Sequence, residues 1–509
     1  MRAMADAFRS MASACTRGPL LVLAGLALAA GCQAGTRLSG TVVATGLWEQ
    51  AQVDVFDAAG LKKSTHTDAQ GRYEVDVAGL EAPLMVVAGS GARQLVALLA
   101  SLPAGTDPVA HVNPLTDKIA SDVATALQPP LGGALDLAEA AKTQAIPAGL
   151  IAAKTRALAD AGLAGALASL GTTPARFDPV AGGAALTPLL QSLRHGRDYD
   201  STAGRYAQTQ LHDAYFHAIS AARPLDPGLA RQVAEATLRV FIVGGSSVGN
   251  HAPDVAPLQG WGQALGGYIA VGKPVAVVNA AQVGHSSRSF ADAGWLDPVK
   301  AGLRRGDYLL IHFGHGDEKC GNEPPDPWPA RDASDIRILC TYPNGKKAPP
   351  EDLSFAASLG RYVTLARQAG ATPVLFTPLT RIRKNPADLT QGVFPYKRTT
   401  HTYGRGRFPG DYAQTVRDTA AALGVALVDL DRLSMEFFTR IGEPGWKEHF
   451  LSVSDTARYP YYASPTVTGN PAQPDTTNLQ EKGAAAVAGL VAEAIKADAT
   501  LAGLAAYLK

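Results

Sequence analysis

Hydrophobic and polar positions change their spacing twice along the chain, and each spacing predicts a different kind of structure. In residues 37–92, apolar and polar side chains alternate in short runs, for example around Val53 and Val55, and turn residues such as Gly60 and Gly71 separate the runs. A period of two residues is typical of strands with one buried face. We therefore predict a small β-sandwich in this region.

Alanine and leucine dominate residues 93–236, where the apolar positions recur at helical spacing. The clearest runs cover residues 115–127, 148–158 and 206–222, and clusters of Pro and Gly separate such runs. Because Pro and Gly end helices, we predict a scaffold of short helices. No residue pattern in this segment indicates chemistry.

Residues 237–509 carry dense runs of Val, Ile and Leu with helical stretches between them. The five runs are Val240–Val243, Val275–Val278, Tyr308–Phe313, Pro373–Thr377 and Val425–Asp429. Near-continuous apolar strands that alternate with helices predict an α/β fold with a mostly parallel five-stranded sheet covered on both faces, in three layers. In such sheets the functional site lies at the carboxyl ends of the strands.

Composition narrows the functional classes. The 509 residues suggest about three domains, and 46 Lys and Arg against 45 Asp and Glu leave a net charge of +1. A near-neutral chain without a stripe of basic and aromatic residues is not expected to bind nucleic acid. The sequence shows no phosphate loop, no cofactor fingerprint and no cluster at metal-ligand spacing, so we expect neither cofactor nor metal.

The first 32 residues have the pattern of a targeting signal. Three arginines precede the apolar run Leu20–Ala30, whose eleven residues are too few to span a bilayer. Small residues follow and lead directly into Cys32, which resembles the cleavage signal of bacterial lipoproteins. This pattern predicts lipid attachment at Cys32 and export to the bacterial cell envelope. Ordinary signal cleavage that leaves Cys32 unmodified is the alternative.

Two of the four cysteines remain in the folded part of the chain under this interpretation. Cys320 and Cys340 would form a disulfide in an oxidising compartment and close a loop of about 20 residues. The alternative is a pair of reduced thiols. A metal site is not expected there, because neither cysteine has a close Cys or His partner at ligand spacing.

Polar residues and glycines follow the predicted strands in four blocks. The first block is Gly244–Asn250, in which Ser246 sits on a glycine-rich turn between a strand and a helix. A serine in such a turn suits a nucleophile, although serine is also a common helix cap. The other blocks are Gly284–Phe290, Gly314–Asp317 and Asp475–Asn478.

In this order, the four blocks resemble the SGNH (GDSL-type) hydrolases, most closely their rhamnogalacturonan acetylesterase-like branch. The resemblance covers residues 237–509. It implies Ser246 as nucleophile, an oxyanion hole from the N–H groups of Ser246 and Gly284, and Asp475 as the residue that orients the catalytic base. A family member would release acetyl groups from a polysaccharide through an acyl-enzyme. Residues 37–92 resemble the carboxypeptidase regulatory-like sandwich.

Three positions depart from the family pattern. Gly245 stands in place of an Asp, Gly316 in place of the oxyanion Asn, and Asn478 in place of the catalytic His. An amide has no basic nitrogen, so Asn478 cannot accept the serine proton. His285 is a candidate compensating base, although a histidine beside a glycine turn is also a common surface or capping residue.

Two functions remain open on the sequence. The first is an unconventional esterase that acts on acetylated polysaccharide, with Ser246 as nucleophile. The second is a non-catalytic lipoprotein that keeps the hydrolase cleft to bind glycans. They differ in whether any imidazole lies near Ser246 in the folded chain.

Overall fold

The protein is described by a computed structural model. It describes residues 37–45, 48–89, 93–102, 107–140, 146–200, 205–318, 354–403 and 410–509. The predicted signal with Cys32, and the predicted disulfide between Cys320 and Cys340, lie outside these residues. Among the helices of the described ranges, none is long and apolar enough to cross a membrane.

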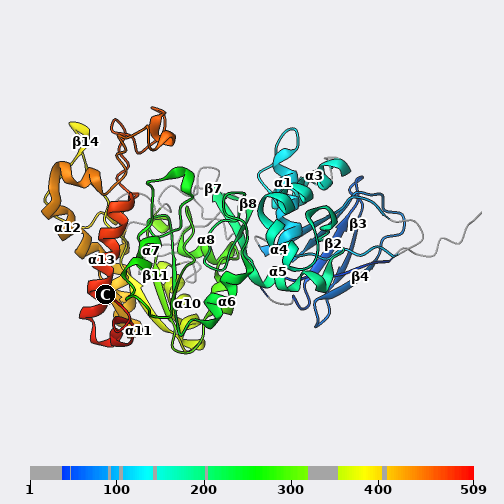
Figure 1. Cartoon of the computed structure of the whole chain (residues 1–509), viewed down its shortest axis with the longest axis horizontal. Coiled ribbons are helices and arrows are strands. Elements are labelled where there is room, and N and C mark those ends of the chain that lie inside the picture. Colours follow the sequence, from blue (N-terminus) through cyan, green and yellow to red (C-terminus); the bar gives the residue numbers. More distant parts are fainter. Residues whose placement is uncertain are drawn as a thin grey trace, which may run out of the picture. The chain divides into compact units, whose positions relative to one another are not determined.

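The amino-terminal strands form two small antiparallel sheets (Figure 1). Strand β1 (Arg37–Thr41) pairs with β4 (Arg72–Asp76), and a second sheet has the order β3 (Lys62–His66), β2 (Gln52–Phe56), β5 (Leu84–Ala88), β6 (Leu95–Leu99). Buried and exposed residues alternate along β4, where Tyr73 and Val75 enter the core. The alternation in the sequence thus forms antiparallel sheets as predicted. Strand β6 extends the second sheet beyond residue 92.

Strand β5 is buried on both of its faces. Leu84 and Val86 pack into the core of the strands, whereas Met85 and Val87 pack against helix α1 (Pro114–Ala126). The five apolar residues of β5 therefore fit a strand between a sheet and a helix.

The segment that follows mixes helices with a β-hairpin. The helices are α2 (Ala134–Ala140), α3 (Ala148–Leu158), α4 (Ala164–Ser169), α5 (Thr187–Ser192) and α6 (Pro227–Glu235). The helix predicted over residues 206–222 is wrong, because β8 (Arg205–His212) pairs with β7 (Arg194–Asp200) instead. The tertiary contacts that stabilise this hairpin have a larger effect than the intrinsic helix propensity of its residues.

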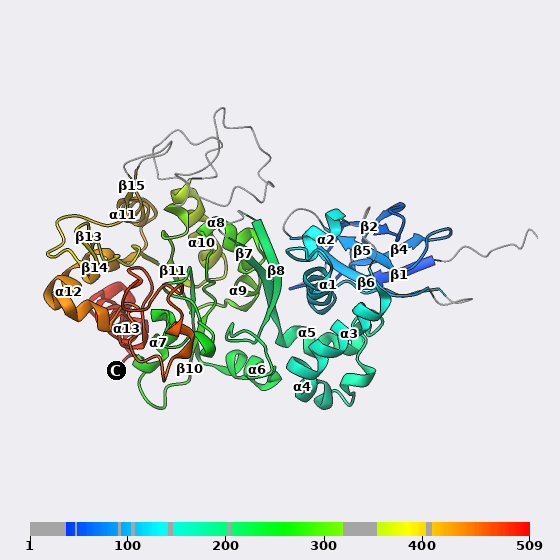
Figure 2. The ribbon, with the colours of Figure 1, turned by 90° about the horizontal axis from the view of Figure 1, so that it is seen from above.

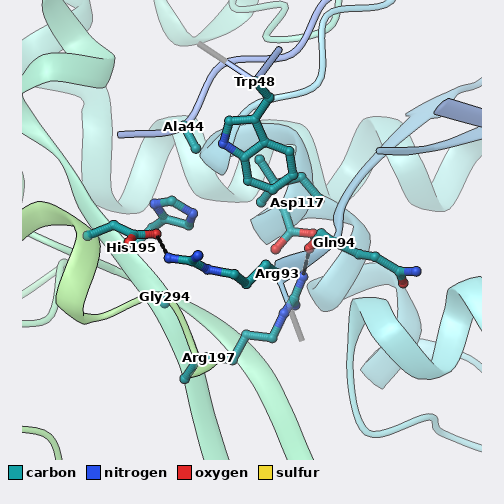
Figure 3. A pocket seen from close by; sticks show the side chains of 12 residues that line it. Ala44, Trp48, Arg93, Gln94, Asp117, His195, Arg197 and Gly294 are labelled. Carbon is teal, nitrogen blue, oxygen red and sulfur yellow. Dashed lines mark hydrogen bonds and ion pairs between the residues drawn. The ribbon is translucent and has the colours of Figure 1, made fainter. Parts of the chain in front are cut away.

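A buried ion pair fixes the hairpin to α1 and β6 (Figure 3). Arg197 Nη2 lies 3.0 Å from Asp117 Oδ1 and donates to the Gln94 carbonyl at 2.5 Å. Thr209 Oγ1 donates to the second Asp117 oxygen at 2.6 Å. The Arg197 guanidinium and the Asp117 carboxylate are both buried and neutralise each other. Loss of either partner would therefore leave a buried charge unpaired.

Residues 238–509 build the α/β sheet that the sequence predicts. Five parallel strands lie in the order β10 (Val275–Asn279), β9 (Leu238–Gly244), β11 (Tyr308–His312), β12 (Thr372–Phe376), β17 (Ala426–Val428). Each predicted apolar run overlaps one of these strands. The described residues also hold two short hairpins, β13 (Lys384–Asn385) with β14 (Asp388–Gly392) and β15 (Thr402–Tyr403) with β16 (Gly410–Asp411).

Helices cover both faces of the sheet, which gives three layers (Figure 2). One face carries α8 (Ser287–Asp292), α9 (Leu296–Gly302), α10 (Phe355–Gln368) and α11 (Tyr412–Leu423), and the other α7 (Trp261–Ala264), α12 (Leu430–Gly445), α13 (Glu481–Ala497) and α14 (Ala502–Ala505). Phe241 and Val243 of β9 enter the first core, and Val240 and Ile242 enter the second. Burial on both faces explains why these strands are continuously apolar.

Candidate active site

Strand β9 ends in a tight turn that presents Ser246. A side chain at Gly244 would lie 2.4 Å from the His312 carbonyl of the adjacent strand, so only glycine fits there. The N–H groups of Val248 and Gly249 then donate to the Gly245 carbonyl at 3.1 and 3.0 Å. Ser246 is partly exposed, whereas Ser247 is buried. The turn therefore leaves Ser246, and not Ser247, accessible from solvent.

Side chains and glycines from neighbouring segments hold this turn in place. Asn279, at the end of β10, donates to the Val248 carbonyl at 2.8 Å and to Asn250 Oδ1 at 3.0 Å. A Cβ at Gly260 would lie 2.3 Å from the Val248 carbonyl carbon, and one at Gly262 would lie 2.8 Å from the Val248 side chain. These close approaches fix the position of the serine.

Backbone N–H groups are available beside the serine. Gly284 follows β10 with φ of 83°, a left-handed conformation that favours glycine. Within the described ranges, the N–H groups of Ser246 and Gly284 donate no hydrogen bond. Unpaired N–H groups of this kind are what an oxyanion hole requires.

The carboxyl-terminal block brings a carboxylate and an amide together. Asp475 Oδ1 accepts hydrogen bonds from the N–H groups of Thr477 and Asn478 at 2.7 and 3.0 Å, and Asn478 Nδ2 donates to Asp475 Oδ2 at 2.6 Å. The amide thus makes the hydrogen bond that an imidazole Nδ1–H would make, but it offers no basic atom in place of Nε2. Asn478 Oδ1 is buried and has no partner among the described residues.

The structure leaves no space for a side chain at Gly316. A Cβ at this position would lie 2.4 Å from the His285 carbonyl oxygen and 2.8 Å from the Ser286 nitrogen. A Cβ at Gly245 would lie 3.2 Å from the same carbonyl. The backbone at His285 therefore occupies the space that an Asn side chain at position 316 would need.

We expect Gly316→Ala to destabilise the protein by about 1–3 kcal/mol, because the added carbon is forced against backbone atoms that cannot rotate away. Gly360→Ala is the matched control. Gly360 lies inside α10, and a Cβ there has open space around it, so it should stabilise the helix by about 0.5–1 kcal/mol. Denaturant unfolding of both variants measures the difference. Equal stability of Gly316→Ala and the parent protein would contradict the steric explanation.

Both ring nitrogens of His285 are engaged within the fold. Nε2 lies 3.0 Å from the Arg197 carbonyl, which can only accept, and Nδ1 lies 3.1 Å from Ser289 Oγ. Burial lowers the pKa of His285 to about 4. The role of compensating base stays a prediction for this residue, and these contacts do not favour it.

His251, which the sequence analysis passed over, is the imidazole that touches the serine turn. Its Nε2 donates to the backbone carbonyl of Ser246 at 2.9 Å. Burial lowers the pKa of His251. The hydrogen bond to the Ser246 carbonyl and the charge of Asp475 act in the opposite direction, but burial has the larger effect. The ring is therefore uncharged near neutral pH. Its spacing of five residues from Ser246 was the available signal, but the first block as defined from the sequence ends at Asn250, one residue before His251.

The carboxyl-terminal block lies alongside the segment that follows the turn. Gln259 N–H donates to the Leu479 carbonyl at 3.0 Å, and Leu258 pairs with Gln480. Asp475 also acts electrostatically on His251. The Ser246 backbone, the His251 ring and the Asp475 carboxylate thus lie in one region beyond the carboxyl end of β9, and the contact between the first two runs through the Ser246 carbonyl. Serine, histidine and aspartate are the residue types that a serine-dependent hydrolase uses, and here they gather at the end of a parallel sheet.

Comparisons with known proteins agree with this class. RhgT, a rhamnogalacturonan acetylesterase of Bacillus subtilis (strain 168), is 30% identical over 259 residues, which cover 51% of this chain and 90% of RhgT. YesY, a probable rhamnogalacturonan acetylesterase of the same strain, is 28% identical over 257 residues, which cover 50% of this chain and 92% of YesY. No family model matches the chain.

Among solved structures, a catalytic mutant of Axe2, an acetylxylan esterase from Geobacillus stearothermophilus, is similar with 16% identity and a TM-score of 0.28. The similarity covers 51% of this chain and 92% of that one. Because RhgT is matched over nearly its whole length, the chain belongs to the SGNH hydrolase family and has rhamnogalacturonan acetylesterase-like homologues.

Proposed function

We propose that the chain is a carbohydrate O-acetylesterase in which Ser246 is the nucleophile and His251 replaces the family histidine as proton acceptor. The observation that carries this proposal is the 2.9 Å hydrogen bond from His251 Nε2 to the Ser246 carbonyl. Because Nε2 carries the proton in that bond, the lone pair of the neutral ring lies on Nδ1. Within the described residues, Nδ1 makes no hydrogen bond of its own.

In the proposed reaction, Ser246 Oγ attacks the acetyl carbonyl carbon while its proton passes to His251 Nδ1, directly or through one water. The N–H groups of Ser246 and Gly284 stabilise the negative oxygen of the tetrahedral intermediate. The intermediate collapses, the sugar oxygen leaves with the proton, and acetyl-Ser246 remains. Water then attacks the acetyl carbon, and the same imidazole accepts and returns the proton. Acetate is released and the serine is regenerated.

Each missing group reduces the expected rate. Loss of one oxyanion donor costs about 10²–10³-fold in related chemistry, and Gly316 offers no side-chain donor. A base held by a backbone carbonyl is also less well oriented than one held by a carboxylate. The proposed enzyme is therefore slow.

The pH dependence of hydrolysis tests the role of His251. A proton acceptor must be uncharged, so activity falls when falling pH protonates it. Because burial lowers the pKa of His251 below its ordinary value of 6.5, we expect the acid limb of kcat/KM to lie below pH 6.5. In His251→Gln, which keeps an N–H donor for the Ser246 carbonyl but has no basic nitrogen, this limb should disappear together with most of the activity. If the acid limb of kcat/KM were unchanged in His251→Gln, His251 would be excluded as the proton acceptor.

The second candidate function is a non-catalytic glycan-binding protein on the same scaffold. It is favoured by the Asp475–Asn478 hydrogen bond, in which an amide fills the place of the base. This alternative predicts that the parent protein binds an acetylated pectin-like polysaccharide and releases no acetate from it. Calorimetric titration together with an acetate assay separates the two functions.

We further propose that the protein is exported and held at the bacterial cell envelope by lipid on Cys32. The support is the pattern of residues 1–32, in which an apolar run ends in small residues before a cysteine. Mass spectrometry of the mature amino-terminus should show an acylated Cys32. An unmodified Cys32 would contradict the anchor while leaving the proposed reaction untouched.

A further inference from the structure

A cavity lies at the opposite end of the sheet from Ser246. It has a volume of about 920 Å³ and is bordered by residues of β1, α5, β7, α6 and β9. Arg239 lines it near the start of β9, whereas Ser246 follows the end of that strand. At about 3.3 Å per strand residue the two lie roughly 20 Å apart. The volume is that of a site for a small organic ligand.

The lining of this cavity is basic. Its described residues include four arginines and neither Asp nor Glu, whereas burial lowers the pKa of the two histidines that line it, His111 and His195. The arginines are Arg194, Arg231, Arg239 and Arg304. Asp307 pairs with Arg239, and Asp213 acts on Arg194 from outside the lining. Arg231 has no ion pair within the described ranges. The cavity therefore favours an anion.

Arg239 is buried, and only some of its hydrogen-bond donors have an acceptor. Its side chain is 7% exposed, and Nε lies 3.0 Å from each Asp307 carboxylate oxygen. Nη1 of the same guanidinium is buried and has no hydrogen-bond partner in the part of the chain that the structure describes. A buried N–H donor without an acceptor is rare in folded proteins. Nη2 makes no hydrogen bond within the described residues either, but unlike Nη1 it is not closed off from solvent, so an anionic ligand in the cavity would meet the guanidinium at Nη2.

The remaining lining combines aliphatic residues with uncharged polar ones such as Asn113 and Gln191. Leu190, Leu193, Val233 and Pro298 line the cavity, and its described lining contains no Phe, Trp or Tyr on which a sugar ring could stack. An apolar body therefore fits this space better than a sugar does. Ala44, which follows β1, and His195 of the hairpin line this cavity and also border the smaller neighbouring pocket that Figure 3 draws.

We propose that this cavity binds an organic anion with an apolar body, a carboxylate, sulfonate or phosphate, at a site separate from the turn that carries Ser246. The charged end of the ligand meets the guanidinium of Arg239, and Arg231 contributes long-range attraction. The apolar end lies against the aliphatic wall. The site joins the amino-terminal segments to the hydrolase domain, so its occupant would stabilise both together.

Fluorescence titration of the full chain with 8-anilinonaphthalene-1-sulfonate tests the proposal. One saturable site is expected, and N-phenyl-1-naphthylamine, which has a similar apolar body without the sulfonate, should bind at least about tenfold more weakly. Two variants locate the site without breaking the Arg239–Asp307 pair. Arg231→Gln removes a charge and Ala230→Trp fills the cavity, and each should weaken binding by about tenfold or more.

Arg305→Gln is the matched control, because Arg305 is an exposed neighbour of Arg304 that does not line the cavity. It should leave the titration unchanged. Equal binding of the dye by Ala230→Trp and the parent protein would overturn the proposal, since the dye would then bind elsewhere. Equal binding of the uncharged amine would show an apolar cavity without anion recognition and would overturn it as well.

Discussion

The Ser246→Ala variant is expected to release acetate from an acetyl ester at the rate of buffer alone. Removing the hydroxyl removes the only atom in the proposed mechanism that can form the acyl-enzyme. In a comparable hydrolase, loss of the serine costs on the order of 10⁶-fold in kcat. Since the parent is slow, we expect a loss of at least about 10³-fold. Release of 4-nitrophenol from 4-nitrophenyl acetate measures it.

Ser247→Ala is the matched control for this experiment. Ser247 is the next residue in the same turn, but its side chain is buried. Its removal should leave hydrolysis within a few-fold of the parent. If Ser246→Ala kept the parent rate and Ser247→Ala did not, the assignment of the nucleophile would be wrong.

The Asn478→His variant is expected to hydrolyse the same ester about 10²-fold faster than the parent or more, since a well-oriented general base contributes about 10²–10⁴-fold. The imidazole can donate from Nδ1 to Asp475 Oδ2, as Asn478 Nδ2 does now at 2.6 Å. Its Nε2 would then add the basic atom that the amide lacks. Asn478→Gln, which changes the side chain without adding a base, should give no gain.

The double variant His251→Gln/Asn478→His separates the two bases. If His251 serves only as the proton acceptor, its replacement should lower the hydrolysis rate in the parent protein but not in the Asn478→His variant. Activity should therefore survive in the double variant. Complete loss in both backgrounds would show that His251 supports the turn and does not accept the proton.

The sequence predicted the hydrolase sheet because both of its faces are buried. Strands such as β9 carry apolar residues at every position, and this pattern is visible without tertiary information. The alternation of β4 predicted the amino-terminal strands in the same way. The hairpin β7–β8 was missed, because buried contacts such as Thr209 with Asp117 are made between residues far apart in the chain.

The sequence predicted only part of the candidate active site, because the remaining contacts depend on the path of the folded chain. Ser246, Asp475 and Asn478 could be named because they stand in ordered blocks. The contact of His251 with the Ser246 carbonyl depends on the path of the turn and could not be read from residue types. The crowding of Gly316 by the His285 backbone likewise arises where two blocks meet.

The most direct test of the central claim is the rate at which a fluorophosphonate labels Ser246. This reagent reacts with an activated serine and needs no turnover, so it reports nucleophile activation alone. The account predicts labelling of the Ser246 peptide in the parent, at least about 10²-fold slower labelling in His251→Gln, and recovery when Asn478→His is added. An unlabelled parent, or equal rates in the parent and His251→Gln, would contradict the account.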